Sequence, residues 1–394
     1  MRDSEKGIKM VNRIFSSRSA WLSVLLCLPV LTRSQTTPAP APAPEPDNPM
    51  LVVRPPSEAK RQGAISPEGR IHLDLIVTDG SGKPVPGLLP MDFTILDDGQ
   101  KRKILSFRSY DGVNVKPNPP VEVILVVDTV NLPFSQISFI HQEIARFLRE
   151  NNGHLAQPVS LMLLSEAGLR IQPRPSVDGN ALLTVLDQIK GSVHGITSAM
   201  GAEGDLERFQ LSLHQMETIA ENEALRPGRK LLIWVGPGWP MLSGPNFSFS
   251  DKDQRRYFDG IVEFSTRMRE ARMALYSVAP ANSIMGSGTR EFLYREFLKG
   301  VRSARQADTG DLALKVLAVQ SGGRILGPDN DIVGQIDSCV ADANAFYTLS
   351  FNPPKAEHAD EYHDLKVTVN QPGLTVRTNS GYYNQLDAGP GGGH

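Results

Sequence analysis

The sequence predicts an α/β fold: a mostly parallel sheet flanked by helices, with a β-sandwich built from strands at both ends of the folded region. In the middle, residues 119–343, apolar β-branched runs alternate with amphipathic helical patterns, which is typical of a parallel sheet. β patterns occupy residues 67–113 before it and 344–384 after it. Because each outer segment is too short to bury an adequate core alone, we expect the two to pack into one sandwich.

The first residues have the features of an export signal. Basic side chains precede an apolar run over 20–31, which is shorter than the roughly 20 residues that span a bilayer. We expect a signal peptide over 1–34, no stable membrane insertion after its cleavage, and a periplasmic or extracellular location. A Pro/Ala-rich linker over 35–66 and a disordered tail over 385–394 should bound the folded region.

Charge and cysteine content narrow the function classes. The 41 basic and 43 acidic residues give a net charge of −2, which predicts no general attraction to nucleic acid. Of the two cysteines, only Cys339 follows the expected signal peptide, so no internal disulfide is expected. Cys339 lies in a helical pattern and should be a small buried hydrophobe.

The elements are expected in the following order. The opening β segment alternates along one face and continues beyond two glycine turns: Ile71, Leu73, Leu75 and Val77, then Phe93, Ile95, Ile104 and Phe107, with turns at 79–82 and 97–99. Central strands are expected over 121–127, 159–164, 230–235, 274–278 and 324–326, with an antiparallel edge strand at 169–171. Helices should follow Asp128, begin at Asp205, and cover 254–272 and 329–342; closing strands are expected over 346–351, 362–369 and 374–377.

The strand over 121–127 runs directly into Asp128, and the carboxyl edge of such a sheet is where α/β proteins present ligands. A hard cation there would need oxygen-bearing side chains at alternate positions after the aspartate. The chain has Val130 and Leu132 at those positions, so the pattern indicates the architecture more clearly than a ligand.

The order of elements resembles that of the von Willebrand factor type A domain superfamily. The flanking motifs resemble the bacterial secreted VWFA-related (acidobacterial) family; they are VTDGSGKPVPGL at 77–88, DFTILDDG at 92–99, YTLSFNP at 347–353, GLTVR at 373–377 and GYY at 381–383. The resemblance covers about residues 71–383 and implies a von Willebrand factor A-like, Rossmann-like sheet.

In metal-binding members of that superfamily, an Asp-x-Ser-x-Ser loop, a threonine and a later aspartate hold a divalent cation. Carried over by position, Asp128 keeps the first ligand, Thr197 stands for the threonine, and Gly236 or Pro237 replaces the last aspartate. The resemblance therefore implies a degenerate metal-ion-dependent adhesion site with no resident metal or cofactor. If Mg²⁺ or Ca²⁺ does bind, Asp128 and Thr197 are the expected ligands.

The loop after the strand over 230–235 carries Trp239 and Met241, followed by Phe247 and Phe249. Aromatic side chains on a scaffold loop are suited to a protein contact, whereas the alternative is that Trp239 and Phe249 pack the loop onto the domain. The cluster over 358–364 could supply metal ligands, but its alternating charges favour a solvated turn.

No nucleophile elbow, zinc-protease helix, phosphate-binding loop or dinucleotide fingerprint occurs in the sequence. We therefore expect an exported, non-enzymatic module that binds an unidentified protein partner, with no nucleic-acid binding. Its binding residues are predicted to be Asp128, Thr129, Asn131, Thr197, Trp239 and Met241. Two alternatives stay open: a divalent-cation-dependent adhesin that uses Asp128, and a hydrolase with an unrecognised site.

Overall fold

A computed structural model describes residues 51–52, 69–172, 174–189, 201–242, 250–281 and 294–385 of the 394-residue chain. The predicted signal peptide (1–34), most of the predicted linker and the tail beyond residue 385 lie outside the described residues.

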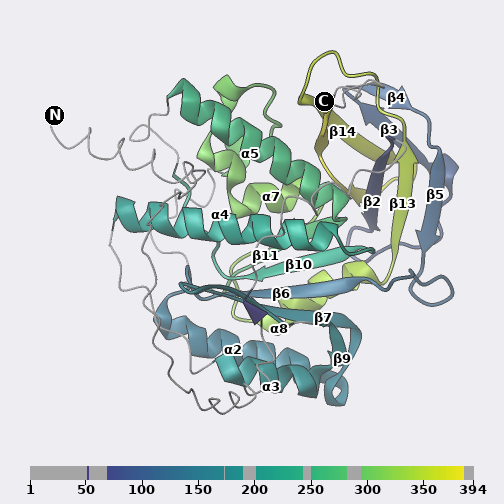
Figure 1. Ribbon diagram of the computed structural model, residues 1–394. Coiled ribbons are helices and arrows are strands. Elements are labelled where there is room, and N and C mark those ends of the chain that lie inside the picture. Colours follow the sequence, from purple (N-terminus) through teal and green to yellow (C-terminus); the bar gives the residue numbers. More distant parts are fainter. Residues whose placement is uncertain are drawn as a thin grey trace, which may run out of the picture. The chain divides into compact units, whose positions relative to one another are not determined.

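An eight-stranded sheet forms the centre of the described chain (Figure 1). Its strands lie in the order β1-β8-β7-β6-β10-β11-β12, and β9 pairs with β7. The bounds are β1 Leu51–Val52, β6 Glu122–Asp128, β7 His154–Ser165, β8 Gly168–Ile171, β9 Ser176–Asp178, β10 Lys230–Val235, β11 Met273–Val278 and β12 Arg324–Ile325. The strands β7, β6, β10, β11 and β12 are parallel neighbours, whereas β8 is antiparallel to β7. Without β1 and β9, numbering the strands along the chain gives the doubly wound order 3-2-1-4-5-6.

The sheet is buried on both faces, and this explains its nearly continuous apolar strands. In β6, Val123 and Leu125 point into one hydrophobic core, and Ile124 points into the other. The helices α2 (Phe134–Arg149), α3 (Gly179–Ile189) and α8 (Ile332–Val340) pack in the first core. The helices α4 (Ala202–Ala224), α5 (Asp251–Glu270) and α7 (Leu314–Gln320) pack in the second, so the two groups cover opposite faces (Figure 1).

Two four-stranded antiparallel sheets pack around a third core. One has the order β15-β2-β13-β5 and the other β16-β14-β3-β4. The bounds are β2 Ile71–Thr78, β3 Phe93–Asp97, β4 Gln100–Arg102, β5 Ser106–Tyr110, β13 Phe346–Phe351, β14 Glu361–Val369, β15 Thr375–Arg377 and β16 Gly381–Asn384. Each sheet therefore joins strands from before and after the central domain, because β2 pairs with β13 and β3 pairs with β14.

The sandwich and the central domain share core side chains. Leu75 and Val77 of β2 point into the sandwich, whereas Ile76 points into the core beneath the parallel sheet. Phe346 belongs to that same core, and Tyr383 belongs to the core on the opposite face of the sheet. Successive side chains of β2 therefore pack into two different cores. A simple two-residue alternation would expose Ile76 to solvent, but Ile76 is buried.

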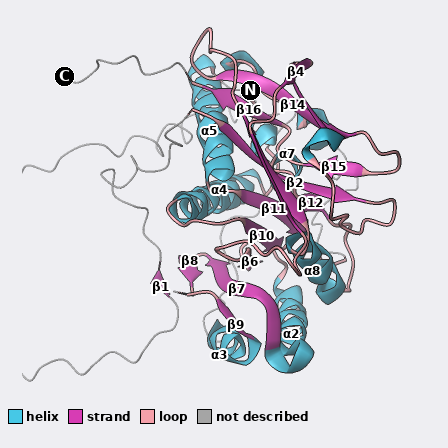
Figure 2. Cartoon of the chain, turned by 90° about the vertical axis from the view of Figure 1, so that its right-hand side faces the viewer, coloured by secondary structure: helices cyan, strands magenta, loops and turns pink. Residues whose placement is uncertain are grey.

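Several elements differ from the sequence prediction. Leu51–Val52, within the predicted linker, pair with β8, so β8 is antiparallel as expected but is not the outermost strand (Figure 2). The last predicted helix is shorter, since α8 begins after Asp331, whose side chain accepts a hydrogen bond from the Gly334 N–H. The prediction missed the short helices α3 and α7.

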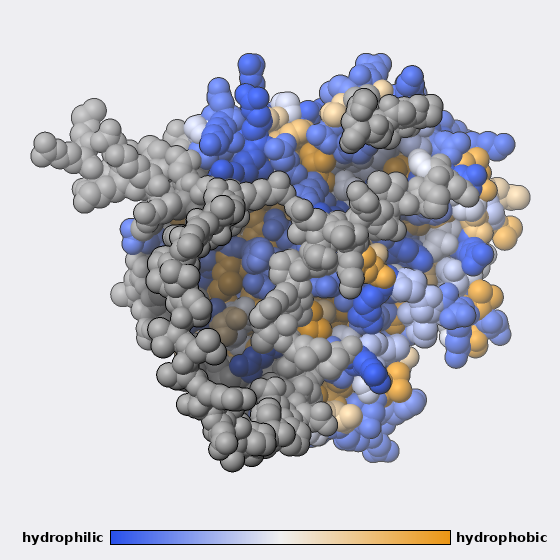
Figure 3. Space-filling view, in the orientation of Figure 1, coloured by the Kyte–Doolittle hydropathy of each residue, from blue (hydrophilic) through white to orange (hydrophobic). Residues whose placement is uncertain are grey.

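The described surface in the view of Figure 3 is mostly hydrophilic, with small separate hydrophobic patches over the sandwich. Among the described residues, no helix is both long and apolar enough to cross a membrane.

Candidate functional site

The candidate site is the sheet edge at which β6 and β10 end. The chain leaves β6 toward β7 on one side and later returns to β10 on the other, so β6 and β10 flank the point where the strand order reverses. In open α/β sheets this point is the usual ligand position. Here β6 ends at Asp128, and Gly236 directly follows β10.

Asp128 is fully buried, and N–H groups of its own chain surround its carboxyl group. One oxygen, Oδ1, accepts hydrogen bonds from the backbone N–H groups of Val130 (3.1 Å) and Asn131 (3.0 Å). The other oxygen, Oδ2, accepts from Asn131 Nδ2 at 2.9 Å and from Trp234 Nε1 at 2.8 Å. A Cβ atom on Gly236 would lie 2.8 Å from the Asp128 Cβ, so this close approach of the two strand ends requires glycine.

Burial raises the pKa of Asp128, and the hydrogen bonds from Asn131 and Trp234 act against that rise. Within the described part of the chain, Asp128 forms no ion pair. Its lone pairs are directed at neutral donors, and this arrangement satisfies a buried carboxyl group without a cation.

The residues that replace the two serine ligands have packing roles. Val130 points into the core on one face of the sheet, and Leu132 points into the core on the other face. Because neither side chain offers an oxygen and Asp128 is already saturated with donors, the loop does not fit a hard divalent cation, which needs about six oxygen ligands.

Thr129 and Asn131, both predicted as binding residues, hold this loop in place. The Thr129 hydroxyl and backbone N–H both donate to the Leu164 carbonyl on β7, at 2.7 and 3.0 Å. Asn131 Nδ2 also donates to the buried Ser212 hydroxyl on α4 at 2.9 Å. The donor groups of both side chains are therefore engaged within the chain, whereas the buried Asn131 Oδ1 has no hydrogen-bond partner among the described residues.

Two roles were open for Trp239, a contact with a partner and packing of the loop onto the domain, and the structure supports the second. The Trp239 side chain is only 5% exposed, and its Nε1 donates to the Leu312 carbonyl at 3.0 Å. Its ring meets the Trp234 ring edge-on, with centroids 5.2 Å apart. Met241 is half-buried beside it. The ring therefore packs the loop onto the domain, since burial of a large aromatic surface is favourable and its single N–H has found an acceptor.

The remaining predicted contacts, Thr197, Phe247 and Phe249, lie outside the described residues. A different aromatic side chain is exposed at the same edge. Phe134, the first residue of α2, directly follows the Asp128 loop and is 73% exposed. The sequence analysis missed it because the apolar stripe of this helix begins at Ile137, and a periodicity argument assigns no role to an apolar residue ahead of the stripe.

A second polar cluster lies in the sandwich, between the predicted turn at 97–99 and the predicted strand over 362–369. His363 Nδ1 lies 2.9 Å from Asp97 Oδ1 and 3.2 Å from Asp98 Oδ2, and His363 is only 5% exposed. The prediction of a solvated turn over 358–364 is therefore wrong at His363, which lies within β14. The antiparallel register of β3 and β14 brings the two segments together, since Leu365 is opposite Asp97.

These three side chains could in principle ligate a metal ion, because one ligand atom from each lies within 4.8 Å of the others. Guanidinium groups already neutralise the carboxylates, however. Arg102 Nε donates to Asp97 at 2.8 Å, and Arg302 Nη2 donates to Asp98 at 2.9 Å. The cluster is therefore an ionic network that joins β3, β4 and β14 to the segment that contains Arg302.

No family model matches the chain. No curated protein matches it either. Among solved structures, the pilus adhesin SpaC from Lactobacillus rhamnosus GG is similar over 76% of this chain, with 12% sequence identity and a TM-score of 0.32. The chain aligns with only 43% of that adhesin, and this likeness carries no argument about fold or function.

Proposed function

We propose that this protein is an exported, non-enzymatic module that binds a protein partner without a metal ion. In this proposal the central domain is von Willebrand factor A-like, and the partner binds at the carboxyl edge of its sheet. The strand order 3-2-1-4-5-6 with an antiparallel β8 supports the assignment of the domain. The N-terminal basic and apolar pattern supports export.

The observation that carries the proposal is the contrast between Asp128 and Phe134 at one edge of the sheet. The carboxyl group of Asp128 accepts hydrogen bonds from Val130, Asn131 and Trp234. Its side chain has no solvent-exposed surface that a ligand could contact. Phe134, at the start of α2, is 73% exposed. An aromatic side chain has few rotatable bonds and therefore loses little conformational entropy on binding, which makes Phe134 suitable as an anchor for a protein contact.

The test compares capture of exported proteins by the immobilised wild-type protein and by two variants, in buffer that contains EDTA. Phe134→Ser removes the proposed anchor. Val113→Ser is the matched control, because Val113 is 77% exposed but lies in the segment that leads into β6 at the opposite edge of the sheet. We expect wild type and Val113→Ser to retain the same partner and Phe134→Ser to lose at least about tenfold in affinity, as for an interface hot spot.

If Phe134→Ser and the wild-type protein captured the partner equally well, the proposal that the partner binds at this edge of the sheet would be wrong. Capture that requires Mg²⁺, Mn²⁺ or Ca²⁺ would instead support the cation-dependent adhesin. Calorimetric titration with the same three ions separates the two models directly, because the proposal predicts no saturable heat from any of them.

A further inference from the structure

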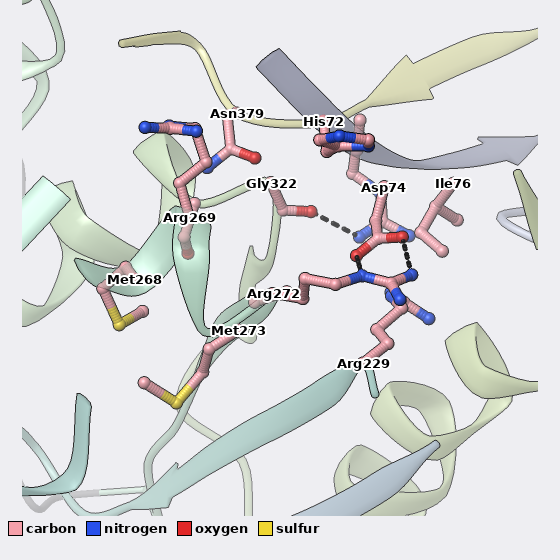
Figure 4. A pocket seen from close by; sticks show the side chains of 13 residues that line it. His72, Asp74, Ile76, Arg229, Met268, Arg269, Arg272, Met273, Gly322 and Asn379 are labelled. Carbon is pink, nitrogen blue, oxygen red and sulfur yellow. Dashed lines mark hydrogen bonds and ion pairs between the residues drawn. The ribbon is translucent and has the colours of Figure 1, made fainter. Parts of the chain in front are cut away.

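His363 of β14 has a buried ring nitrogen, Nε2, with no hydrogen-bond partner among the described residues. Most buried polar groups in proteins are paired, as Arg272 is in its two-pronged ion pair with Asp74 beside the small cavity of Figure 4. His363 is only 5% exposed, so its ring is nearly sealed from solvent. Because an unpaired buried acceptor is costly, the surroundings of Nε2 indicate what it can bind.

The other ring nitrogen, Nδ1, sets the state of the His363 ring. It lies 2.9 Å from Asp97 Oδ1. Asp97 also accepts hydrogen bonds from Arg102 Nε and from the Tyr382 hydroxyl, so Nδ1 is the donor in this contact. The Tyr382 ring stacks on the imidazole, with centroids 5.0 Å apart. In the neutral ring Nε2 therefore presents a lone pair in a fixed direction, and metal-binding histidines are held by a carboxylate in the same way.

The nearest anionic group to this lone pair is on the same strand. Alternate residues of a strand lie on one face, and Nε2 is 4.0 Å from Oε1 of Glu361, two residues earlier on β14. The other oxygen, Glu361 Oε2, accepts a hydrogen bond from the Glu357 N–H at 2.8 Å, which orients the carboxyl group. His358 Nδ1 lies 3.8 Å from that same oxygen. Each oxygen of this one carboxyl group thus has an imidazole nitrogen within 4.0 Å.

Two imidazoles and one carboxylate are a ligand set for Zn²⁺, which takes nitrogen and oxygen ligands at about 2.0–2.2 Å. Two ligands of one such ion are therefore at most about 4 Å apart. The separations of 4.0 and 3.8 Å require only a small approach, and the His358 side chain, which is 67% exposed, can turn to make it. Residues 357–364 contain four acidic side chains and no lysine or arginine, which also favours a cation.

We infer that His358, Glu361 and His363 form a Zn²⁺ site that fastens the loop between β13 and β14 to β14. His363 binds the ion through Nε2, and a water molecule takes the fourth position. Asp97 keeps its hydrogen bond to Nδ1 and holds the ring, so the ionic network around Asp97 supports the site without supplying a ligand. The site is separate from the proposed partner-binding edge, because its ligands lie in the sandwich.

The test is titration of the purified full chain, without a histidine tag, with Zn²⁺ in competition with a chromophoric chelator. We expect one tight site in the wild-type protein and at least about tenfold weaker binding in His358→Ala and in Glu361→Gln, because loss even of an outer-shell partner weakens metal binding 10–100-fold. His214→Ala is the matched control. His214 and Glu217 on α4 form an exposed pair with the same three-residue spacing and 4.0 Å between Nδ1 and Oε2, so this variant should bind as the wild-type protein does.

Absence of saturable Zn²⁺ binding in the wild-type protein would overturn the inference, as would wild-type affinity in both His358→Ala and Glu361→Gln. Weaker binding by His214→Ala would also count against it, because the ion would then bind on the surface of α4. His363→Gln removes the buried ligand and should lose the site if circular dichroism shows that it folds; wild-type affinity in that variant would refute the role of Nε2. If it does not fold, the two variants at the partly exposed positions decide.

Discussion

The stability of the Asp128→Asn variant distinguishes between two roles for the Asp128 carboxyl group: a structural hydrogen-bond acceptor, or a ligand for a cation that is not bound. If Asp128 were a ligand awaiting a metal ion, it would be a buried charge lacking part of its coordination, and its neutralisation would leave the metal-free protein equally stable or more stable. In the structure it instead accepts hydrogen bonds from Val130, Asn131 and Trp234. We therefore expect Asp128→Asn to destabilise the fold.

The magnitude follows from these contacts. In its best orientation, the asparagine oxygen keeps the two backbone N–H groups and the 3.1 Å bond from Asn131 Nδ2. Its NH₂ group then faces Trp234 Nε1, which loses its acceptor, and Asn131 Nδ2, which loses one of its two bonds to the carboxyl group. Loss of one hydrogen bond to a charged acceptor costs about 1.5–3 kcal/mol, and the bonds that remain become weaker with a neutral acceptor. Relief of the desolvation offsets much of this loss, because desolvation outweighs these hydrogen bonds and raises the pKa of Asp128. The donor–donor contact with Trp234 remains, so we expect a net loss of about 1–2 kcal/mol in the free energy of unfolding.

The assay is urea unfolding in EDTA, followed by tryptophan fluorescence and by far-ultraviolet circular dichroism. The buried Trp234 reports on the site itself, and agreement between the two probes tests whether unfolding is two-state. Asp259→Asn, an exposed position on α5, is the control and should change stability by less than about 0.5 kcal/mol. A double-mutant cycle with Trp234→Phe should give a coupling of about 1–2 kcal/mol.

Unchanged or increased stability of Asp128→Asn in EDTA would refute the reasoning. A coupling energy near zero with Trp234→Phe would show that the 2.8 Å contact contributes nothing, and the account of the sealed carboxylate would then fail.

Three further predictions concern other buried groups. Asp342→Ala should cost about 3–5 kcal/mol in urea unfolding, because it leaves Arg377 and the buried Tyr276 hydroxyl unpaired; a loss below about 1 kcal/mol would contradict this. Burial raises the pKa of Asp311 to about 7, so the stability contributed by its protonated form is complete below the ordinary value of 3.8 and is lost as pH rises through about 7. Asp311→Asn should therefore flatten the decline in stability between about pH 4 and 7, and an unchanged pH profile would exclude this origin. Burial also raises the pKa of Cys339 to about 12, so iodoacetamide at pH 8 should label its peptide only after unfolding, as measured by mass spectrometry.

The sequence alone was sufficient where a pattern is local and strong. The strands Lys230–Val235 and Phe346–Phe351 have the predicted bounds, because every residue in β10 and nearly every residue in β13 is buried. In β10 the apolar run is continuous from residue 231 onward, and in β13 only Thr348 and Ser350 interrupt it. The helix α7 was missed because its seven residues make too few turns for a periodic signal. The helix α3 was also missed, although its 11 residues carry an apolar stripe of Leu182, Val185 and Leu186. The assignment of the central domain to the von Willebrand factor A superfamily stays a prediction.

For the candidate sites, the sequence determined only where Asp128 lies along the chain and that the loop after it lacks serine oxygens. Tertiary structure decided that Trp234, from another strand, donates to Asp128, and that Trp239 faces inward. It also brought His363 to Asp97 through strand register. The physical reason is that the period of a helix or strand specifies which face a side chain occupies, whereas its hydrogen-bond and charge partners come from segments distant in the sequence.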